Sequence, residues 1–134
     1  MKGSLRTRRQ FAEVYETGRK AVGPRVIAFA LQRPDPLPAG DPAQPGGIAR
    51  GIVASRRVGG AIQRNRAKRI IRAALRPLIP RLRRPLWIVL VARQQAADRS
   101  VRSHEVQVEL EGLLSRLDIL VPETPTPTVP EAPC

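Results

Sequence analysis

The segment from Ala61 to Leu78 constrains the fold most, because its apolar and basic residues fall on opposite sides of one helix. At 100° per residue, the apolar side chains show the i, i+3, i+4, i+7 spacing of a helix that faces a core. These residues are Ala67, Ile70, Ile71, Ala74, Leu75 and Leu78. The opposite side carries Asn65, Lys68, Arg69, Arg72 and Arg76, with Arg66 at its margin. We therefore predict a helix anchored by one side and cationic on the other.

Two further helices and three strands are predicted from the remaining apolar patterns. Thr7 and Gln10 have the spacing of a capping box that begins a helix, and Gly18 is a suitable residue to end it. Ser103 is a good N-cap for the last helix. Residues 86–92 are almost all apolar, which is typical of a strand covered on both faces. In chain order we expect helix 7–17, strands 26–31 and 48–55, helix 61–78, strand 86–92 and helix 103–117.

Two proline-rich segments interrupt these elements. Residues 33–47 hold five prolines and three glycines, so we expect an irregular, mobile loop that joins the first two strands as a hairpin. Residues 121–134 hold five prolines and no periodicity, so we expect a disordered tail. The predicted fold class is α+β, a single-domain sandwich over residues 1–120 in the order helix, strand, strand, helix, strand, helix.

The positive charge is concentrated in the middle of the chain. Of the net charge of +13, residues 42–97 contribute thirteen Arg or Lys and no Asp or Glu, whereas the part before carries +4 and the part after −4. Such crowding repels itself unless a polyanion neutralises it, which predicts a nucleic-acid partner. A membrane surface is the rival partner, but it requires an insertable aromatic face, and the chain has four aromatic residues. We expect no membrane association.

The residue types also limit the chemistry that the chain can perform. Cys134 is the only cysteine, which excludes a disulfide or a thiolate zinc site within one chain. His104 is the only histidine, and we expect it to face solvent in the first turn of the last helix. The carboxylates avoid the basic region, so we predict no catalytic residue and no metal site in the protein. The first nine residues lack a secretory pattern, which indicates the cytoplasm.

The stretch 54–75, ASRRVGGAIQRNRAKRIIRAAL, resembles the signature of the bacterial ribonuclease P protein component. Its centre is the triplet Arg64, Asn65 and Arg66, followed by Lys68 and Arg69. The wider pattern is similar too: two aromatic residues four apart in a first helix, a strand that ends in a serine before a basic pair, and a leucine-rich last helix. The resemblance covers about residues 5–117.

The resemblance implies a fold seen in ribosomal proteins, with a left-handed crossover between parallel strands, against the usual handedness. It implies that the central helix docks on a catalytic RNA, and that a cleft between the first helix and the sheet binds the 5′ leader of precursor tRNA. The implied contacts to the catalytic RNA are Arg64, Asn65, Arg66, Lys68, Arg69, Arg72 and Arg76. The implied contacts to the leader are Phe11, Tyr15, Phe29, Ser55, Arg56 and Arg57.

The same resemblance implies that the leader is removed endonucleolytically by the holoenzyme. The RNA is then the catalyst and binds Mg²⁺, while the protein binds no cofactor and no small-molecule ligand. Gly60 departs from the family pattern, where a polar or basic residue often stands. The proline-rich loop is longer than the family pattern, and the acidic, proline-rich tail is not part of it.

Plainer interpretations stand beside these. Phe11, Tyr15 and especially Phe29 can be ordinary core residues, and Asn65 can satisfy its own backbone in a helical turn. A ribosomal RNA-binding protein would explain the charge without a substrate cleft, and sequencing the copurified RNA would separate the two. A protein-only nuclease would need a carboxylate cluster, which the basic region does not contain.

Overall fold

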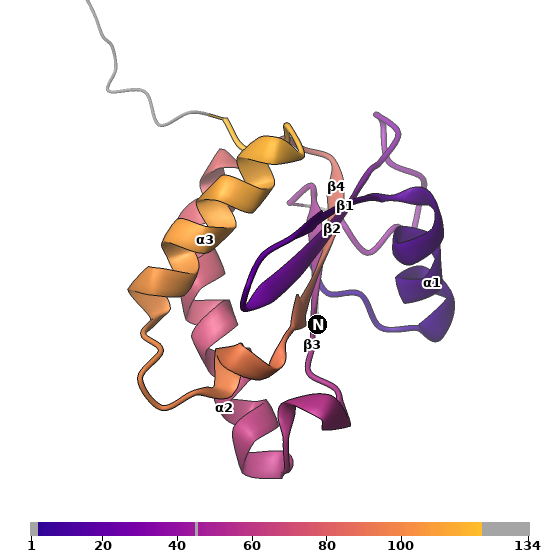
Figure 1. Ribbon diagram of the computed structural model, residues 1–134. Coiled ribbons are helices and arrows are strands. Elements are labelled where there is room, and N and C mark those ends of the chain that lie inside the picture. Colours follow the sequence, from indigo (N-terminus) through magenta and orange to yellow (C-terminus); the bar gives the residue numbers. More distant parts are fainter. Residues whose placement is uncertain (1–2, 45, 122–134) are drawn as a thin grey trace, which may run out of the picture.

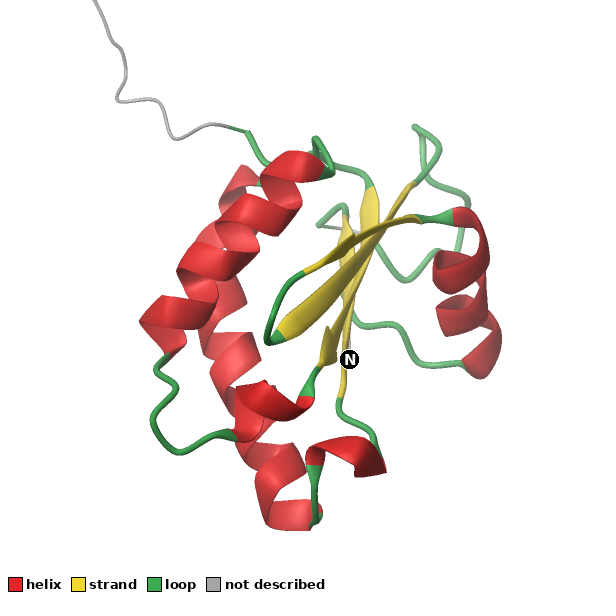
Figure 2. Cartoon of the chain, in the orientation of Figure 1, coloured by secondary structure: helices red, strands yellow, loops and turns green. Residues whose placement is uncertain are grey.

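The computed structural model describes residues 3–44 and 46–121 as one sheet with helices on both faces (Figure 1). The helices are α1 (Arg8–Thr17), α2 (Ala61–Leu75) and α3 (Ser103–Arg116), and the strands are β1 (Arg19–Val22), β2 (Val26–Gln32), β3 (Ile48–Val53) and β4 (Leu86–Ala92). Three short 3₁₀ helices, η1 (Arg56–Val58), η2 (Arg76–Arg81) and η3 (Gln94–Ala97), connect them. Helix α1 lies on one face of the sheet, and α2 and α3 lie on the other (Figure 2). The predicted α+β class is confirmed.

The strand order is β1-β2-β4-β3. Strand β4 is antiparallel to β2 and parallel to β3, and its residues are buried except for a partly exposed Val91. The prediction of a central, doubly covered strand is therefore confirmed. The predicted hairpin of the strands 26–31 and 48–55, which are β2 and β3 of the structure, is wrong, because β4 lies between them. Its uninterrupted apolar side chains can be buried only with a strand on each side and helices above and below.

The fourth strand, β1, was missed because it has almost no apolar pattern. Of its four residues only Ala21 is buried, and Arg19, Lys20 and Val22 are exposed at the edge of the sheet. β1 pairs with β2 through a tight turn, with Arg19 opposite Ala30 and Val22 opposite Ile27. The sequence of an edge strand is often polar, because no further strand pairs with its outer edge and its side chains stay exposed to solvent.

The connection from β3 through α2 to β4 joins two neighbouring parallel strands, so it is a crossover. The left-handed sense expected for this crossover stays a prediction. Helix α2 ends at Leu75, earlier than predicted, and the chain continues as η2. Pro77 and Pro80 cannot donate backbone hydrogen bonds, which explains the change from α to 3₁₀ geometry. Leu78 is nevertheless buried in the core, as predicted.

The larger core lies between the sheet and the pair α2 and α3. The predicted apolar side of α2 faces it, with Ile70 partly buried and the other five predicted residues buried. The predicted inward residues of α3 are buried as well: Val106, Leu110, Leu113, Leu114 and Leu117. The opposite side of α2 is thereby turned away from the core. Within the described residues, no helix is long and apolar enough to cross a membrane.

The ends of α1 follow the predicted residues, with one difference in mechanism. Thr7 Oγ1 accepts from Gln10 N at 3.1 Å while Thr7 N donates to Gln10 Oε1 at 3.1 Å, which is the predicted capping box. Gly18 ends the helix in an extended conformation (φ −80°, ψ 175°), not the left-handed one. A Cβ there would lie 2.7 Å from the Ala30 carbonyl oxygen, so close packing against β2 requires the glycine.

The described residues of the proline-rich loop, 33–44 and 46–47, form no helix or strand, as predicted, yet the loop is anchored at its centre. Asp41 is buried, and its carboxylate accepts hydrogen bonds from Trp87 Nε1 at 2.8 Å and Ala43 N at 2.9 Å. Arg33 donates from Nη2 at 2.9 Å to the same carboxylate, and its guanidinium lies 4.0 Å from the centre of the Trp87 ring. The predicted disordered tail lies outside the described residues, apart from Val121.

Candidate nucleic-acid interface

The register of the strands sorts the side chains on the α1 face of the sheet into three rows that run across the strands. We call them the loop row, the helix row and the open row. The loop row is Ala49, Trp87 and Leu31. The helix row is Gly51, Val89, Phe29 and Lys20. The open row is Val53, Val91, Ile27 and Val22.

Each row has a different cover. The proline-rich loop packs on the loop row, since Ala43 and Leu37 belong to the same apolar cluster as Trp87. Helix α1 lies on the helix row: Phe11 contacts Gly51 so closely that a Cβ there would lie 2.5 Å from the ring. Among the described residues the open row is the least covered of the three, since Val53, Val91 and Ile27 are only partly buried and Val22 is 45% exposed. The row is a strip of β-branched apolar side chains left accessible at the surface.

The three aromatic residues of the predicted leader site meet beside this strip. The Tyr15 ring packs edge-on against Phe29 with ring centres 4.9 Å apart, and Phe11 lies 6.5 Å from Tyr15. Phe11 and Phe29 are partly buried, whereas Tyr15 is 40% exposed. Burial raises the pKa of the Tyr15 phenol, so this ring is neutral at physiological pH.

Helical geometry places Tyr15 on the side of α1 that faces the open row. Glu13 reaches towards the loop, because its carboxylate pairs with Arg33 at 3.3 Å. Residues two apart in an α-helix point about 200° away from each other, so Tyr15 projects from the opposite flank. The exposed part of the Tyr15 ring therefore borders the open row and not the proline-rich loop.

A cavity of about 1050 Å³ continues the open row beyond the ends of β3 and β4. Three open-row residues, Val22, Ile27 and Val91, line it. Its remaining lining comes from η1, α2, η3 and the segments around them, with Ser55, Arg57, Gln63, Arg93, Gln94, Gln95 and Asp98 as the polar members. Of the predicted leader residues, Ser55 and Arg57 thus reach the same groove, and Arg56 is exposed next to them in η1. We call the open row and this cavity the groove.

Ser55 also caps the short 3₁₀ helix that follows β3. The strand was predicted to run to Ser55 but ends at Val53, and Ser55 Oγ instead accepts from Arg57 N at 3.3 Å. This cap begins η1, which turns the chain from β3 towards α2. Gly59, with φ of 143°, and Gly60, the N-cap of α2, follow. The positive φ explains why position 59 is a glycine, since other residues rarely adopt it.

The basic side of α2 forms the second candidate surface. Arg69, Arg72, Arg76 and Asn65 are exposed, and Arg64, Arg66 and Lys68 are partly exposed. Within residues 3–44 and 46–121, ion pairs join Arg25 to Glu109, Arg33 to Glu13 and Asp41, Arg81 to Glu111, and Arg83 to Asp118. None of these pairs involves α2. Its cations are held on a rigid helix without an internal counter-charge in the described part of the chain.

The side-chain hydrogen bonds also show that the cations of α2 have few partners within the described residues. Arg64 Nε donates to the Gly60 carbonyl at 3.4 Å, and no other predicted cation of the helix makes a side-chain hydrogen bond among the described residues. Asn65 makes none either, so the turn-stabilising role considered for it is not seen. The contrast with other arginines is clear: Arg81 and Arg84 donate to main-chain carbonyl oxygens.

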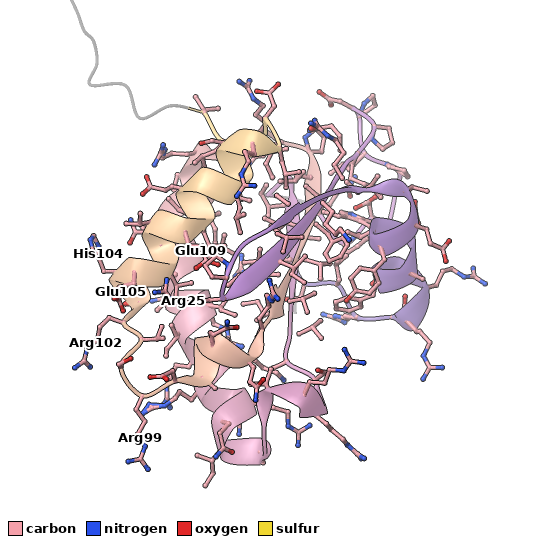
Figure 3. All side chains as sticks on the ribbon, in the orientation of Figure 1. Arg25, Arg99, Arg102, His104, Glu105 and Glu109 are labelled. Atoms are coloured by element: carbon pink, nitrogen blue, oxygen red, sulfur yellow. The ribbon has the colours of Figure 1, made fainter. Side chains whose placement is uncertain are left out.

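The charged residues around the start of α3 belong to neither of these two surfaces. Arg25 and Glu109 face each other between the β1–β2 turn and α3, and His104 projects from the start of α3, while Arg102 and Arg99 project from the segment before that helix (Figure 3). His104 is exposed, as predicted. Among residues 3–44 and 46–121, no three His, Cys, Asp or Glu side chains gather as metal ligands would.

Sequence reasoning found the aromatic residues and the basic helix side but missed most of the groove. Val22, Ile27, Val91 and Arg93 come from three separate strands or their ends. They become neighbours only through the β1-β2-β4-β3 register, which no local pattern specifies. The one available signal was the alternation of large and small apolar residues along 27–31, which indicates that the two faces of this strand have different covers.

Comparison with known proteins places the chain in a family. A family model described as Ribonuclease P matches residues 1–118. The ribonuclease P protein component of Symbiobacterium thermophilum is 35% identical over 116 residues, 87% of this chain and 91% of that protein. The corresponding protein of Shouchella clausii is 30% identical over 118 residues, 88% of each chain.

Solved structures agree on the fold. The RNase P protein of Staphylococcus aureus superposes with a TM-score of 0.68 at 20% identity and covers 90% of this chain and 99% of that one. The RNase P protein of Thermotoga maritima gives 0.66 at 24% identity and covers 84% and 96%. At these identities the likeness concerns the fold alone.

The fold and the two surfaces together define a small basic α+β protein. It has a cationic helix on one side of its sheet and, on the other side, an apolar row bordered by aromatic side chains. The matched family gives this class its name. The chain belongs to the ribonuclease P protein component family. The resemblance found in the 54–75 stretch is therefore confirmed.

Proposed function

We propose that this chain is the protein subunit of ribonuclease P and promotes endonucleolytic removal of the 5′ leader from precursor tRNA. The observation that carries the proposal is the separation of two surfaces suited to RNA. The cations of α2 have no internal ion-pair partner in the described residues, and the open row lies on the other face of the sheet, where the cavity continues it past the ends of β3 and β4. One rigid domain can therefore hold two stretches of RNA at once.

The basic side of α2 is the proposed contact with the catalytic RNA. Its predicted residues, from Arg64 to Arg76, extend over about 18 Å at 1.5 Å per residue, enough to meet several phosphates. Arginines offer paired donors that match phosphate geometry. Asn65 adds a donor and an acceptor, which can fix orientation where point charges cannot.

The groove is the proposed contact with the single-stranded leader. Unpaired bases stack on aromatic rings and apolar surfaces, and each stack contributes about 1 to 3 kcal/mol. Tyr15 and the open row supply such surfaces, while Arg57 and Arg93 at the groove wall supply cations for phosphates. Helical and paired parts of the substrate offer no free base faces, so the groove selects the leader.

The proposal assigns hydrolysis to the catalytic RNA and its magnesium ions. The protein supplies binding and neutralises phosphates that would otherwise repel one another, which lowers the magnesium requirement of the RNA. It needs no cofactor or small-molecule ligand of its own, and its partners are the catalytic RNA and precursor tRNA. The expected location is the cytoplasm, where precursor tRNA is made in bacteria.

Reconstitution tests the whole proposal. Cleavage of a 5′-labelled precursor tRNA is measured with the chain alone, with a bacterial ribonuclease P RNA alone, and with both at low magnesium. We expect rapid release of the leader only when both are present. Leader release by the chain without RNA would contradict it, and so would a rate for the RNA that the chain does not change.

Tyr15→Ala tests the leader groove. Loss of one stacking ring is expected to weaken binding of precursor tRNA to the holoenzyme about tenfold, within the range of one base–aromatic stack. Binding of mature tRNA is expected to stay the same. Val108→Ala on α3, which also shortens an exposed apolar side chain, is the matched control. Equal losses for precursor and mature tRNA would argue against a leader contact at Tyr15.

A further inference from the structure

We propose that Ile62, in the first turn of α2, packs against one unpaired base of the catalytic RNA, and that the side-chain amide of Asn65 binds the edge of the same base. This inference rests on the proposed function and adds base recognition to it, whereas the cations of α2 recognise phosphates. Binding then depends on the structure of the RNA as well as on its charge.

Ile62 is the most exposed large apolar residue among those that the structure describes. Its exposed fraction is 81%, against 55% for Val108 and 45% for Val22. It precedes the fully buried Ile71 by nine residues, which turn an α-helix by about two and a half turns. The two isoleucines therefore project in opposite directions, and Ile62 points away from the core into solvent.

Ile62 lies in line with the cations of α2. At 100° per residue, Arg69 is rotated about 20° from Ile62 around the helix axis, and Arg66 about 40°. These arginines follow one to two helical turns later on the same outer side. An RNA whose phosphates contact Arg66 and Arg69 therefore also covers Ile62. Burial of this side chain in the interface follows from the geometry of the helix.

The surroundings of Ile62 indicate what covers it. Helix α2 contains no acidic residue, and η1 before it carries Arg56 and Arg57, so the surface favours a polyanion. A phosphate is a poor neighbour for an apolar side chain, because it loses water without gaining a hydrogen bond. The apolar surface of RNA is the face of its bases, which is hidden by stacking in a duplex and accessible where the bases are unpaired. The occupant is therefore an unpaired base.

Asn65 provides the polar half of the contact. It follows Ile62 by three residues, which places the two Cβ atoms about 5–6 Å apart on one side of the helix. Its side chain is exposed and makes no hydrogen bond to another described residue. The amide offers both a donor and an acceptor, the combination that the pairing edge of a base requires. One base can therefore rest on Ile62 while its edge meets Asn65.

Ile62→Ala tests the apolar half through the affinity for a bacterial ribonuclease P RNA at several salt concentrations. Alanine removes three carbon atoms from the contact, and we expect binding to weaken about tenfold, as when partly buried methyl groups are lost. The salt slope is expected to stay at the wild-type value, because no phosphate contact changes. Val108→Ala, on α3, is the matched control and is expected to leave affinity and slope unchanged.

Chemical probing of the RNA tests whether a base is the partner. Dimethyl sulfate and a carbodiimide together modify the pairing edges of all four unpaired bases. On RNA saturated with protein, we expect the wild-type chain to protect an unpaired base that becomes reactive again with Ile62→Ala and also with Asn65→Ala. The Val108→Ala control is expected to keep that base protected.

The outcomes separate this inference from the proposed function. Wild-type affinity for Ile62→Ala, a changed salt slope, or protection of the same bases by all variants would overturn the base contact. The proposed function would stand in those cases, because the cations of α2 would still hold the RNA. No binding of the wild-type chain to the ribonuclease P RNA would contradict the proposed function and this inference together.

Discussion

Asp41 is a single residue that changes the interpretation of a whole segment. The sequence shows a proline-rich stretch without pattern, yet three donors converge on this carboxylate inside the protein. Burial by itself would raise the pKa of Asp41, but hydrogen bonds from Ala43, Trp87 and Arg33, with the charge of Arg33, hold its pKa below the ordinary value. The loop is thereby fixed to β4 and, through Arg33 and Glu13, to α1.

Asp41→Asn is therefore expected to destabilise the protein by about 3 kcal/mol, because it leaves the Arg33 guanidinium without its buried counter-charge. Urea unfolding followed by the fluorescence of Trp87, the only tryptophan, measures the change. Asp35→Asn, at an exposed position in the same loop, is the matched control and is expected to change stability by less than about 0.5 kcal/mol.

The lowered pKa of Asp41 also predicts a pH dependence. The ionised form is favoured in the native state, so its stabilising contribution is complete above the ordinary aspartate pKa of about 3.9 and is lost as the pH falls through the lowered value. Wild type should lose stability below about pH 4, and Asp41→Asn should lose less over the same interval. Parallel curves for the two proteins would show that Asp41 is not the group responsible.

At the scale of elements, Glu109 joins α3 to the β1–β2 turn. Its carboxylate accepts from the backbone N of Arg25 and of Val26, both at 2.9 Å, and pairs with the Arg25 side chain at 3.2 Å. A Cβ at Gly23 would collide with this carboxylate, so the glycine leaves room for it. One side chain on α3 thus holds the turn that positions the outermost strand.

Glu109→Gln is expected to cost about 2 kcal/mol in the free energy of unfolding, because the amide keeps one oxygen acceptor and its NH2 group then faces another donor, either the two backbone N–H groups or the partly buried Arg25 guanidinium. Glu16→Gln on the exposed side of α1 is the matched control. Thermal and urea unfolding of both variants check the prediction. A loss for Glu109→Gln no larger than that of the control would contradict the clamp.

Helices and strands with a strong apolar pattern were predictable from the sequence, but the pairing of the strands was not. The apolar stripes of 61–78 and 103–117 gave the helices and their buried sides, and the apolar run 86–92 gave the central strand. The pairing of β4 with β2 and β3 depends on contacts between segments far apart in sequence, which periodicity does not contain. β1 was missed because Arg19 and Lys20 look like part of a polar loop.

At the scale of the whole molecule, two properties distinguish its surfaces: where the positive charges lie, and which part of the sheet the helix α1 and the proline-rich loop leave uncovered. The acid-free middle of the sequence predicted a polyanion partner, and the fold places most of its cations on the outer side of α2 and around the groove, whereas Arg81 and Arg83 pair with carboxylates near η2. The groove could not be predicted because it is what remains of one sheet face after α1 and the proline-rich loop cover the other two rows. Coverage of this kind is a property of the assembled fold and not of any segment.

The central claim is that the cations of α2, and not net charge in general, bind the catalytic RNA. It is tested by the salt dependence of that binding in two variants that each lose three positive charges. One carries Arg66→Ala, Arg69→Ala and Arg72→Ala on α2. The other carries Arg99→Ala, Arg102→Ala and Arg116→Ala, which are exposed residues before and on α3.

The measurement is the slope of the logarithm of the binding constant against the logarithm of the salt concentration. The slope is negative, because salt weakens binding. For the α2 variant we predict that its magnitude is smaller than that of wild type by about 3, roughly one for each lost phosphate contact. For the α3 variant we predict a slope close to that of wild type. Equal slopes for the two variants would contradict the account, because binding would then depend on total charge and not on the helix that displays it.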